Sequence, residues 1–390
     1  MDLATNIKRL LAEVERVDPE RLVIDSLSEF RLLAQDAVWY RRQLLALKQF
    51  FGGRRTTVLL LDDRTSRDDL QFHSVVNGVM RLETLRRSYG VTRRRLEVVK
   101  IRGAGYREGF HDYTVDRRGV SVYPRLVAAE HGGEFPEGQL PSGLPALDAM
   151  FGAGIERGSS TLLLGPTGVG KSSIATLYAF SAATRGERAV VYSFDESVRS
   201  AKIRARSLGM AIDREIERQH LCFEPVDPAE LSPGEFVSRI RHEVQEKNTR
   251  VIVIDSLNGL MHAMQGEFDL AAHLHELLAF LAQKGVATLV VLTQHGLVGQ
   301  VYADIEISYL ADAVFLMRYF EVAASVRHAV SIVKKRSGPH ENTIRELTFG
   351  KDGLHIGEPL VGFKGILSGL PDAIQLQQLL SEGPGNGSKS

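Results

Sequence analysis

The residues between 161 and 173 carry the clearest chemical signal in this sequence, which reads TLLLGPTGVGKSS there. Segment 165–172 fits the pattern G-x-x-x-x-G-K-[ST] at every fixed position. Glycines in such a loop let backbone N–H groups turn toward phosphate oxygens, and the following helix presents its positive end. Lys171 can reach the β- and γ-phosphates of a nucleotide, and the Ser172 hydroxyl can ligate Mg²⁺. The motif predicts these nucleotide-binding residues: Gly165, Thr167, Gly168, Val169, Gly170, Lys171, Ser172 and Ser173.

The flanks of this loop distinguish it from a glycine-rich turn that happens to precede a helix. Four strand-compatible residues, 161–164, come before it, and a helix-compatible segment, 174–183, comes after it. A phosphate-binding loop requires this strand–loop–helix context. The sequence therefore predicts a nucleotide-binding protein.

Carboxylates end two apolar runs and are candidates for metal binding and catalysis. Asp255 ends the run VIVID, where it can hold Mg²⁺ directly or through water, or merely cap the next turn. Asp195 and Glu196 end another run, beside the loop in a RecA-type sheet. One of them can polarise the attacking water while the other supports the metal, unless the pair is only a solvated turn. The predicted metal ligands are Ser172, Asp195 and Asp255, and the predicted catalytic residues are Lys171, Asp195 and Glu196.

Basic residues follow the last predicted strand of the second half, at Lys334, Arg336 and His340. On a lone domain they would form a solvated charge run. In a ring they could project into a neighbour's site and stabilise developing phosphate charge. Gln294 closes a strand whose end should face the γ-phosphate, so it is a candidate sensor of that group.

The composition is that of a soluble protein with two or three domains in 390 residues. Lys plus Arg and Asp plus Glu both number 48, so the net charge indicates no partner. The single cysteine, Cys222, excludes an internal disulfide and a cysteine-based zinc site, and it fits a reducing cytoplasm. No apolar run approaches the ~18 residues of a membrane span, which predicts no membrane association.

Apolar strands alternate with helices in both halves of the chain. The predicted helices cover 6–17, 34–50, 81–89, 174–183 and 270–284, and the predicted strands include 21–27, 58–62, 96–102, 162–165, 189–194, 251–257, 287–292, 313–317 and 329–333. This alternation predicts an α/β fold with a mostly parallel sheet flanked by helices.

The two halves also repeat each other. The letters VIDSL occur at 23–27 and again at 253–257, and Gly119 and Gly353 mark a second match at an offset of 234. The first copy lacks about 90 residues, including any phosphate loop, by comparison with the second. We therefore predict a partial first domain at 1–130, a linker at 131–139, a complete domain at 140–370 and a tail at 371–390 whose end is disordered.

The ordered segments GPTGVGKS, SFDES, VIVIDSL, ISYLADAV and SIVKKRSGPH, with the duplication, resemble the KaiC family of RecA-like P-loop ATPases. The resemblance spans 1 to about 370. It implies tandem RecA-like domains in a hexameric ring that binds ATP and Mg²⁺ between subunits, with a role in signalling or regulation and with a regulatory protein partner left open. Asp195 and Glu196 match the family's paired catalytic glutamates, with Asp replacing the first. Lys334, Arg336 and His340 match residues that reach the adjacent subunit's nucleotide.

The family's second domain can phosphorylate itself on an adjacent Ser-Thr pair. The matching positions here are Ser308 and Tyr309, so the resemblance implies a phosphorylation site at Ser308 and puts a two-site cycle in doubt. Two other classes stay open. A DNA-handling recombinase or helicase motor shares the fold, although no aromatic residues are interleaved with the basic runs 54–55 and 93–95, which disfavours DNA. The second open class is a non-catalytic scaffold that uses ATP only to assemble.

The partial first domain has a physical consequence. Strands of a parallel sheet are normally covered on both faces, so removing the front of a domain should leave an open edge and an exposed apolar face. We expect the natural protein to begin upstream of Met1, or another chain to cover the gap.

Overall fold

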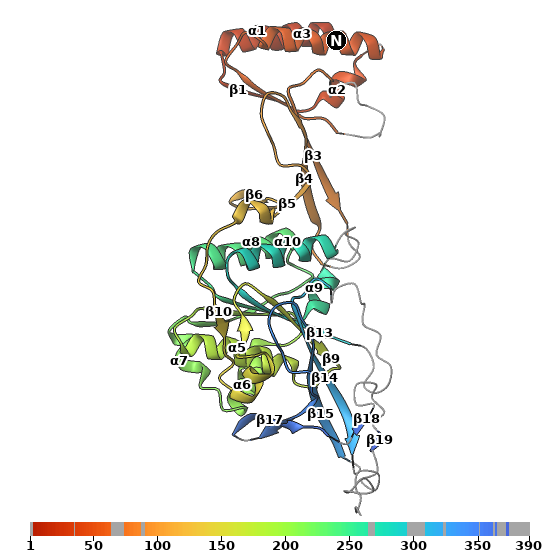
Figure 1. Cartoon of the computed structure of the whole chain (residues 1–390). Helices are drawn as coiled ribbons and strands as arrows, with labels where there is room; N and C mark the ends of the chain where they lie inside the picture. Colours follow the sequence, from red (N-terminus) through yellow and green to blue (C-terminus); the bar gives the residue numbers. More distant parts are fainter. Residues whose placement is uncertain are drawn as a thin grey trace, which may run out of the picture. The chain divides into compact units, whose positions relative to one another are not determined.

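The computed structural model describes residues 3–34, 36–63, 74–86, 90–263, 270–294, 309–322, 325–350, 352–361, 363–364 and 372–373. The chain divides into two compact units (Figure 1). The first unit comprises Met1–Glu83 with Arg95–Phe110, and the second comprises Thr84–Arg94 with His111–Ser390.

A nine-stranded sheet forms the centre of the second unit, in the order β11-β10-β12-β13-β9-β14-β15-β16-β17. Neighbouring strands from β11 to β14 run parallel, and β15 to β17 add antiparallel strands at one side. Their bounds are β9 Ser160–Gly165, β10 Ala189–Ser193, β11 Leu221–Pro225, β12 Val251–Asp255, β13 Ala287–Thr293, β14 Ala313–Val322, β15 Ser325–Lys335, β16 Arg345–Gly350 and β17 Gly353–Pro359.

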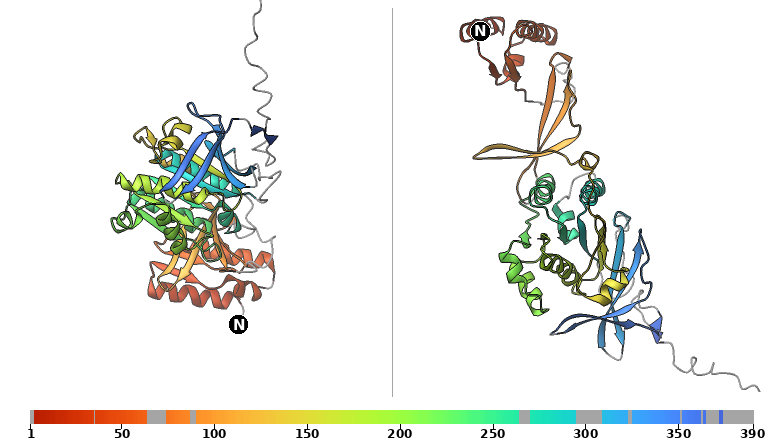
Figure 2. Two further views of the ribbon diagram at one scale, coloured as in Figure 1. Left: turned by 90° about the horizontal axis from the view of Figure 1, so that it is seen from below. Right: turned by 60° about the vertical axis from the view of Figure 1, so that its left-hand side comes forward.

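Helices cover both faces of this sheet (Figure 2). Residues alternate along β12, so that Val253 packs in the cluster with α5 to α7 and Ile252 packs in the cluster with α8 and α10. Burial on both faces explains why these strands read as continuous apolar runs. The covering helices are α5 Lys171–Thr184, α6 Val198–Ser207, α7 Ile212–Glu217, α8 Pro233–Glu246 and α10 Leu270–Gln283.

Shorter elements complete the second unit. They are β5 Phe110–Asp116, β6 Gly119–Tyr123, the 3₁₀ helix η2 Ala128–His131, β7 Gln139–Leu140, α4 Pro145–Met150, β8 Ile155–Glu156, α9 Leu257–Ala263, β18 Phe363–Lys364 and β19 Asp372–Ala373. The fold-class prediction is confirmed, because the unit is α/β with a large, mostly parallel sheet between helices. The predicted tail 371–390 lies outside the described residues apart from 372–373.

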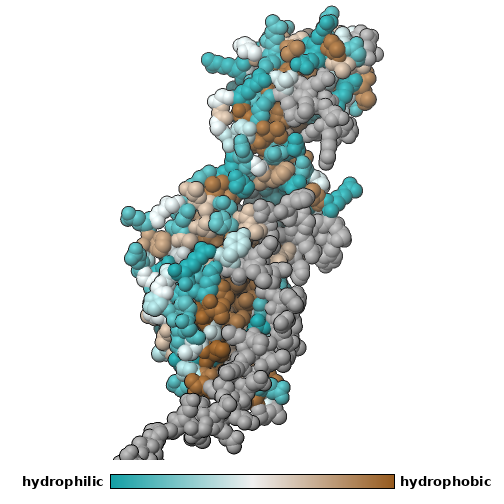
Figure 3. All heavy atoms as spheres, turned by 45° about the vertical axis from the view of Figure 1, so that its right-hand side comes forward, coloured by the Kyte–Doolittle hydropathy of each residue, from teal (hydrophilic) through white to brown (hydrophobic). Residues whose placement is uncertain are grey.

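The first unit has a smaller core, in which α1 (Leu3–Val17) and α3 (Ala37–Phe51) pack on the parallel strands β1 (Arg21–Ile24) and β2 (Thr57–Leu60). A short helix, α2 (Leu27–Leu32), follows β1. Ile24 and Leu60 lie toward these helices, whereas Val23 and Leu59 lie on the other face and are about half exposed, at 55% and 49%. Figure 3 shows apolar residues on the surface of this unit. The expectation of an exposed apolar face agrees with these positions.

The predicted helix at 81–89 is wrong where the structure describes it, because β3 (Gly78–Leu85) is a strand beside β4 (Arg93–Ile101). Residues of β3 alternate between exposed and half-buried. Arg81 pairs with Glu97 at 3.0 Å, and Glu83 pairs with Arg95 at 2.9 Å, in both cases from one strand to the other. The segment is rich in helix-favouring residues, and the strand pairing overrides that local preference.

Candidate nucleotide-binding site

The predicted phosphate loop leaves the middle of the nine-stranded sheet. Its strand, β9, pairs in parallel with β13 on one side and β14 on the other, and all six of its residues are buried. The loop turns at 166–170, and α5 begins at Lys171 after Gly170, which has a φ of 106°. The structure therefore has the strand–loop–helix geometry that the motif requires, with the helix N-terminus at the loop.

Lys171 lies within the loop that it is predicted to serve. Its Nζ donates hydrogen bonds to the carbonyl oxygens of Gly165 at 2.9 Å and Pro166 at 2.6 Å. Only 5% of the residue is exposed, and burial lowers the pKa of its amine to about 8, against a smaller opposing effect of Asp255. A phosphate group would replace these carbonyls with a stronger, charged partner.

The predicted metal ligands meet at the same edge of the sheet. Asp255 ends β12, and burial raises the pKa of its carboxyl, while a hydrogen bond with the Ser172 side chain acts in the opposite direction. No group of three or more His, Cys, Asp or Glu side chains in the described ranges could hold a metal ion alone. Mg²⁺ commonly takes one or two carboxylates together with phosphate oxygens and water, so a hydroxyl beside a buried carboxylate fits it.

The predicted catalytic pair follows β10, which is the parallel neighbour of β12. Asp195 accepts a hydrogen bond from the Ser256 hydroxyl, directly after Asp255 in the chain. Glu196 forms an ion pair with Arg204 on α6. Both acids raise the pKa of Asp255, so the three carboxylates lie close together.

Gln294 also lies at this edge. Its backbone N–H donates to the carbonyl oxygen of Gly165 at 3.0 Å, and the residue is 6% exposed. Its side-chain oxygen is buried and has no hydrogen-bond partner among the described residues. Asn258 on α9 fixes the preceding residue, because its amide bonds both the N–H and the carbonyl of Thr293.

Three residues with aromatic rings pack over the loop, and no motif in the sequence indicated them. Tyr319 donates from its hydroxyl to the carbonyl oxygen of Thr167 at 3.1 Å. Its ring lies 5.1 Å from that of His328, which in turn lies 5.1 Å from the ring of Phe349. Phe349 approaches Gly170 so closely that a Cβ there would lie 2.3 Å from the phenyl ring. Burial lowers the pKa of His328, which favours its neutral form.

The basic residues lie at the other edge of the sheet. Strand register places Lys335 opposite Ala313, and Ala313 opposite Thr161 at the start of β9. Lys334, Arg336 and His340 therefore lie away from this chain's own phosphate loop, which follows the end of β9. The prediction that they serve a nucleotide is compatible only with a nucleotide held by another subunit.

The basic segment is held in a fixed arrangement. Arg336 donates to the carbonyl oxygen of Tyr309 and lies 3.4 Å from Asp312 Oδ1, yet 54% of its side chain is exposed. Asp312 Oδ2 accepts hydrogen bonds from the N–H and the hydroxyl of Ser160, both at 2.9 Å. Lys334 donates to the carbonyl oxygen of Ala311 at 2.8 Å. The predicted phosphorylation site, Ser308, lies outside the described residues.

The sheet order and the loop define the class of this protein, a P-loop nucleotide-binding protein with a RecA-like sheet. A family model described as "ATPase: KaiC" matches residues 1–127 and 140–361. The chain belongs to the KaiC family of ATPases.

Relatives of this chain include the circadian clock protein KaiC3 of Synechocystis, which is 27% identical over 380 residues. That match covers 95% of this chain and 74% of the relative. The circadian clock oscillator proteins KaiC of Synechococcus elongatus and Acaryochloris marina are 26% and 24% identical, each over 97% of this chain and 73% of the relative. In the part of the chain that the structure describes, no helix is both long and apolar enough to cross a membrane.

Proposed function

We propose that this protein binds ATP with Mg²⁺ and hydrolyses it at sites shared between neighbouring subunits of a homo-oligomeric, hexameric ring. One observation carries the proposal: the phosphate loop and the basic residues, among them the exposed Arg336, lie at opposite edges of one sheet. A head-to-tail association brings the two edges together between subunits, and such an association closes into a ring when its rotation allows.

Within one site, each residue has a role that its geometry supports. Backbone N–H groups of the loop and the amine of Lys171 bind the phosphates. Asp255 and the hydroxyl of Ser172 would hold Mg²⁺, which neutralises phosphate charge when bound. The partly exposed rings of Tyr319, His328 and Phe349 at the loop offer an aromatic surface that suits the base of the nucleotide.

The chemical step requires a positioned water. Asp195 and Glu196 follow the strand beside Asp255, and each is already oriented, by Ser256 and by Arg204 respectively. One of these carboxylates accepts a proton from the water as its oxygen attacks the γ-phosphorus. The bond to the β,γ-bridging oxygen breaks, and Arg336 of the neighbour stabilises the charge that develops.

Mixed subunits test the shared site. Lys171→Ala leaves the basic edge intact, and Arg336→Ala leaves the loop intact, so each protein alone should be inactive. A mixture creates some interfaces with both parts intact and should regain ATPase activity. Arg206→Ala, which removes an exposed arginine paired with Asp213, is the matched control and should stay active. A mixture without activity, or a strictly monomeric protein in ATP, would contradict the proposal.

A second activity, slow self-phosphorylation at Ser308, is supported by its neighbour in sequence. The carbonyl oxygen of Tyr309 accepts a hydrogen bond from Arg336, so Tyr309 is anchored at the basic edge that would meet the adjacent nucleotide. Phosphopeptide mapping of residues 301–318 after incubation with ATP should find one phosphate on Ser308 and none on Tyr309. An unmodified peptide would leave only the ATPase.

We propose a cytoplasmic role in signalling or regulation, with a regulatory protein as a further partner. The KaiC relatives named above carry circadian clock names, which supports regulation more than DNA handling. ATP turnover measured with and without DNA separates the two, because a DNA motor should accelerate on DNA and this protein should not.

A further inference from the structure

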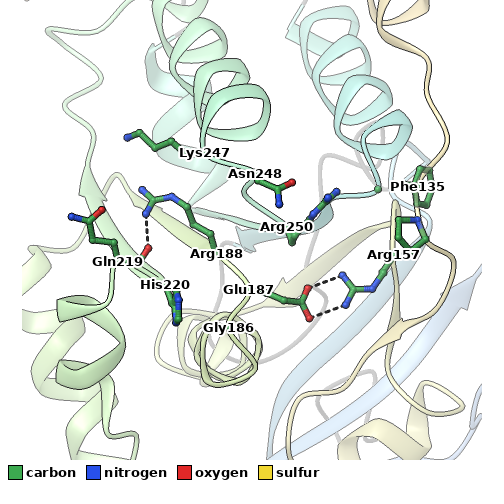
Figure 4. Close-up of a pocket in the computed structure, with 12 residues that line it drawn as sticks. Phe135, Arg157, Gly186, Glu187, Arg188, Gln219, His220, Lys247, Asn248 and Arg250 are labelled. Atoms are coloured by element: carbon green, nitrogen blue, oxygen red, sulfur yellow. Dashed lines mark hydrogen bonds and ion pairs between the residues drawn. The ribbon is translucent and has the colours of Figure 1, made fainter.

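A second cavity lies in the same unit, at the edge of the sheet where the parallel strands begin. Its volume is about 580 Å³, within the ~300–1,000 Å³ that small-molecule sites occupy. Figure 4 shows its walls, which include the side chains of Arg157, Arg188, Lys247 and Arg250. The phosphate loop follows the opposite ends of these strands, so the cavity is separate from the nucleotide-binding site.

Helix ends and strand starts build this cavity. The helices α5, α8 and α10 end here, and left-handed residues (Gly186, Asn248 and Gly285) turn the chain into the next strands. Arg188 and Arg250 each stand directly before a strand, β10 and β12. Arg250 donates to the carbonyl oxygen of Lys284 at 3.3 Å, at the end of α10, where a positive charge complements the helix dipole.

The positive charge of the cavity exceeds what its carboxylates neutralise. Arg157 forms a bidentate pair with Glu187, at 2.7 and 2.8 Å. Arg188 and Lys247 share one carboxylate, Glu243, at 3.0 and 2.6 Å. Four cations therefore face two carboxylates.

Arg250 is the cation left without a carboxylate among the described residues. Within the described residues its guanidinium makes one hydrogen bond, to the Lys284 carbonyl, which uses one of five N–H donors. The residue is half-buried, and Figure 4 shows its side chain between those of Asn248 and Phe135. Half-buried donors without partners are the feature that an oxyanion satisfies best, because guanidinium and phosphate pair bidentately.

One wall of the cavity is aromatic. Phe135 packs against Gly285 so closely that a Cβ on this glycine would lie 2.5 Å from the ring. This packing fixes the phenyl ring beside the arginines. A ligand can therefore contact the ring with an apolar or aromatic group while its anionic group reaches Arg250.

We propose that this cavity binds a phosphate ester, with the phosphate on Arg250 and the organic part against Phe135. The site is independent of the phosphate loop and does not rest on the proposed ATPase. Its ligand is a small molecule that carries one phosphate and a ring or an apolar group.

Phenyl phosphate is a suitable probe, titrated by calorimetry into the full chain carrying Lys171→Ala, which removes the charged phosphate ligand of the loop. Arg250→Gln should weaken binding about tenfold or more, as expected for a lost charge-assisted pair. Phe135→Ala should weaken phenyl phosphate but not inorganic phosphate. Arg239→Gln removes an exposed arginine of α8 and should change neither, which makes it the control.

Three outcomes would overturn the proposal. The first is that phenyl phosphate does not bind, and the second is that Arg250→Gln and Arg239→Gln bind it with equal affinity while both melt at the same temperature. The third is that the cavity binds benzoate as tightly as phenyl phosphate, which would show no preference for phosphate. A loss of ATPase activity in Lys171→Ala bears on the nucleotide site alone, so the two proposals fail separately.

Discussion

The letters VIDSL occur twice in this chain, and the two copies have different surroundings. Val253 lies in β12 between β10 and β13 and is fully buried, whereas Val23 lies in β1, beside β2, and is 55% exposed. The same residues thus form the inside of one sheet and the surface of another. A continuous apolar run predicts a strand, but the strands and helices packed around that strand determine whether its side chains are buried.

The missing neighbour can be identified by setting the two copies side by side. In the second copy the sheet runs β12-β13-β9-β14-β15, and β9 joins the two halves of this order. In the first copy, β1 pairs with β2, but β3 and β4 belong to a different sheet. The described first copy has no counterpart of β9, and its sheet is divided at that place. The strand that leads into the phosphate loop is therefore also the strand that connects the two parts of the sheet.

The comparison predicts that all nucleotide chemistry belongs to the second copy. Lys171→Ala should lower ATP turnover by about 10²-fold or more, because it removes the charge on the phosphates. Lys48→Ala, an exposed change on α3 of the first copy, should leave turnover unchanged. Steady-state phosphate release measures both, and normal turnover in Lys171→Ala would assign the chemistry elsewhere.

Matched substitutions in the repeated letters test the difference in burial. Val253→Ala should lower the free energy of unfolding by about 2–4 kcal/mol, since it opens a cavity in a closed core. Val23→Ala should change it by less than about 0.5 kcal/mol, as exposed positions do. Denaturant unfolding of the two variants provides the measurement. Similar losses would mean that β1 is covered in solution.

The exposed face of β1 and β2 should also be visible to a hydrophobic dye. The double variant Val23→Thr with Leu59→Thr should bind less dye and be more soluble than the parent chain, because threonine suits a strand and removes apolar surface. Val58→Thr, on the half-buried side of β2, is the control and should not reduce dye binding. A parent chain that binds no dye would show that this face is covered.

A further prediction concerns the pH dependence of stability. The pKa of Lys171 is about 8 in the folded chain and ordinary, near 10.5, in the unfolded one. Between these values the unfolded chain binds more protons, so the contribution of Lys171 to stability rises with pH from about 8 to 10.5. Lys171→Met should remove this rise and add stability at pH 7, which unfolding curves at pH 7 and 10 can show. The same rise in both proteins would assign it to other groups.

Local sequence determined much of this structure and part of the site. The phosphate loop and the acids at the ends of β10 and β12 could be located, because each stands at the end of an apolar run in the sequence. Tyr319, His328 and Phe349 could not, since they come from three strands that meet at the loop only through sheet order. The strand at β3 was missed for the related reason that its ion pairs with β4 have no local signal.

Asp312 gives the molecule a further property. It holds Ser160, the first residue of the strand that ends in the phosphate loop, and it also holds Arg336 at the basic edge. In a head-to-tail ring, each subunit would thus connect the nucleotide at one interface with the nucleotide at the next, always in the same order. Such a ring has two distinct faces to every interface, so the order of phosphate loop and basic residues runs in one direction around it.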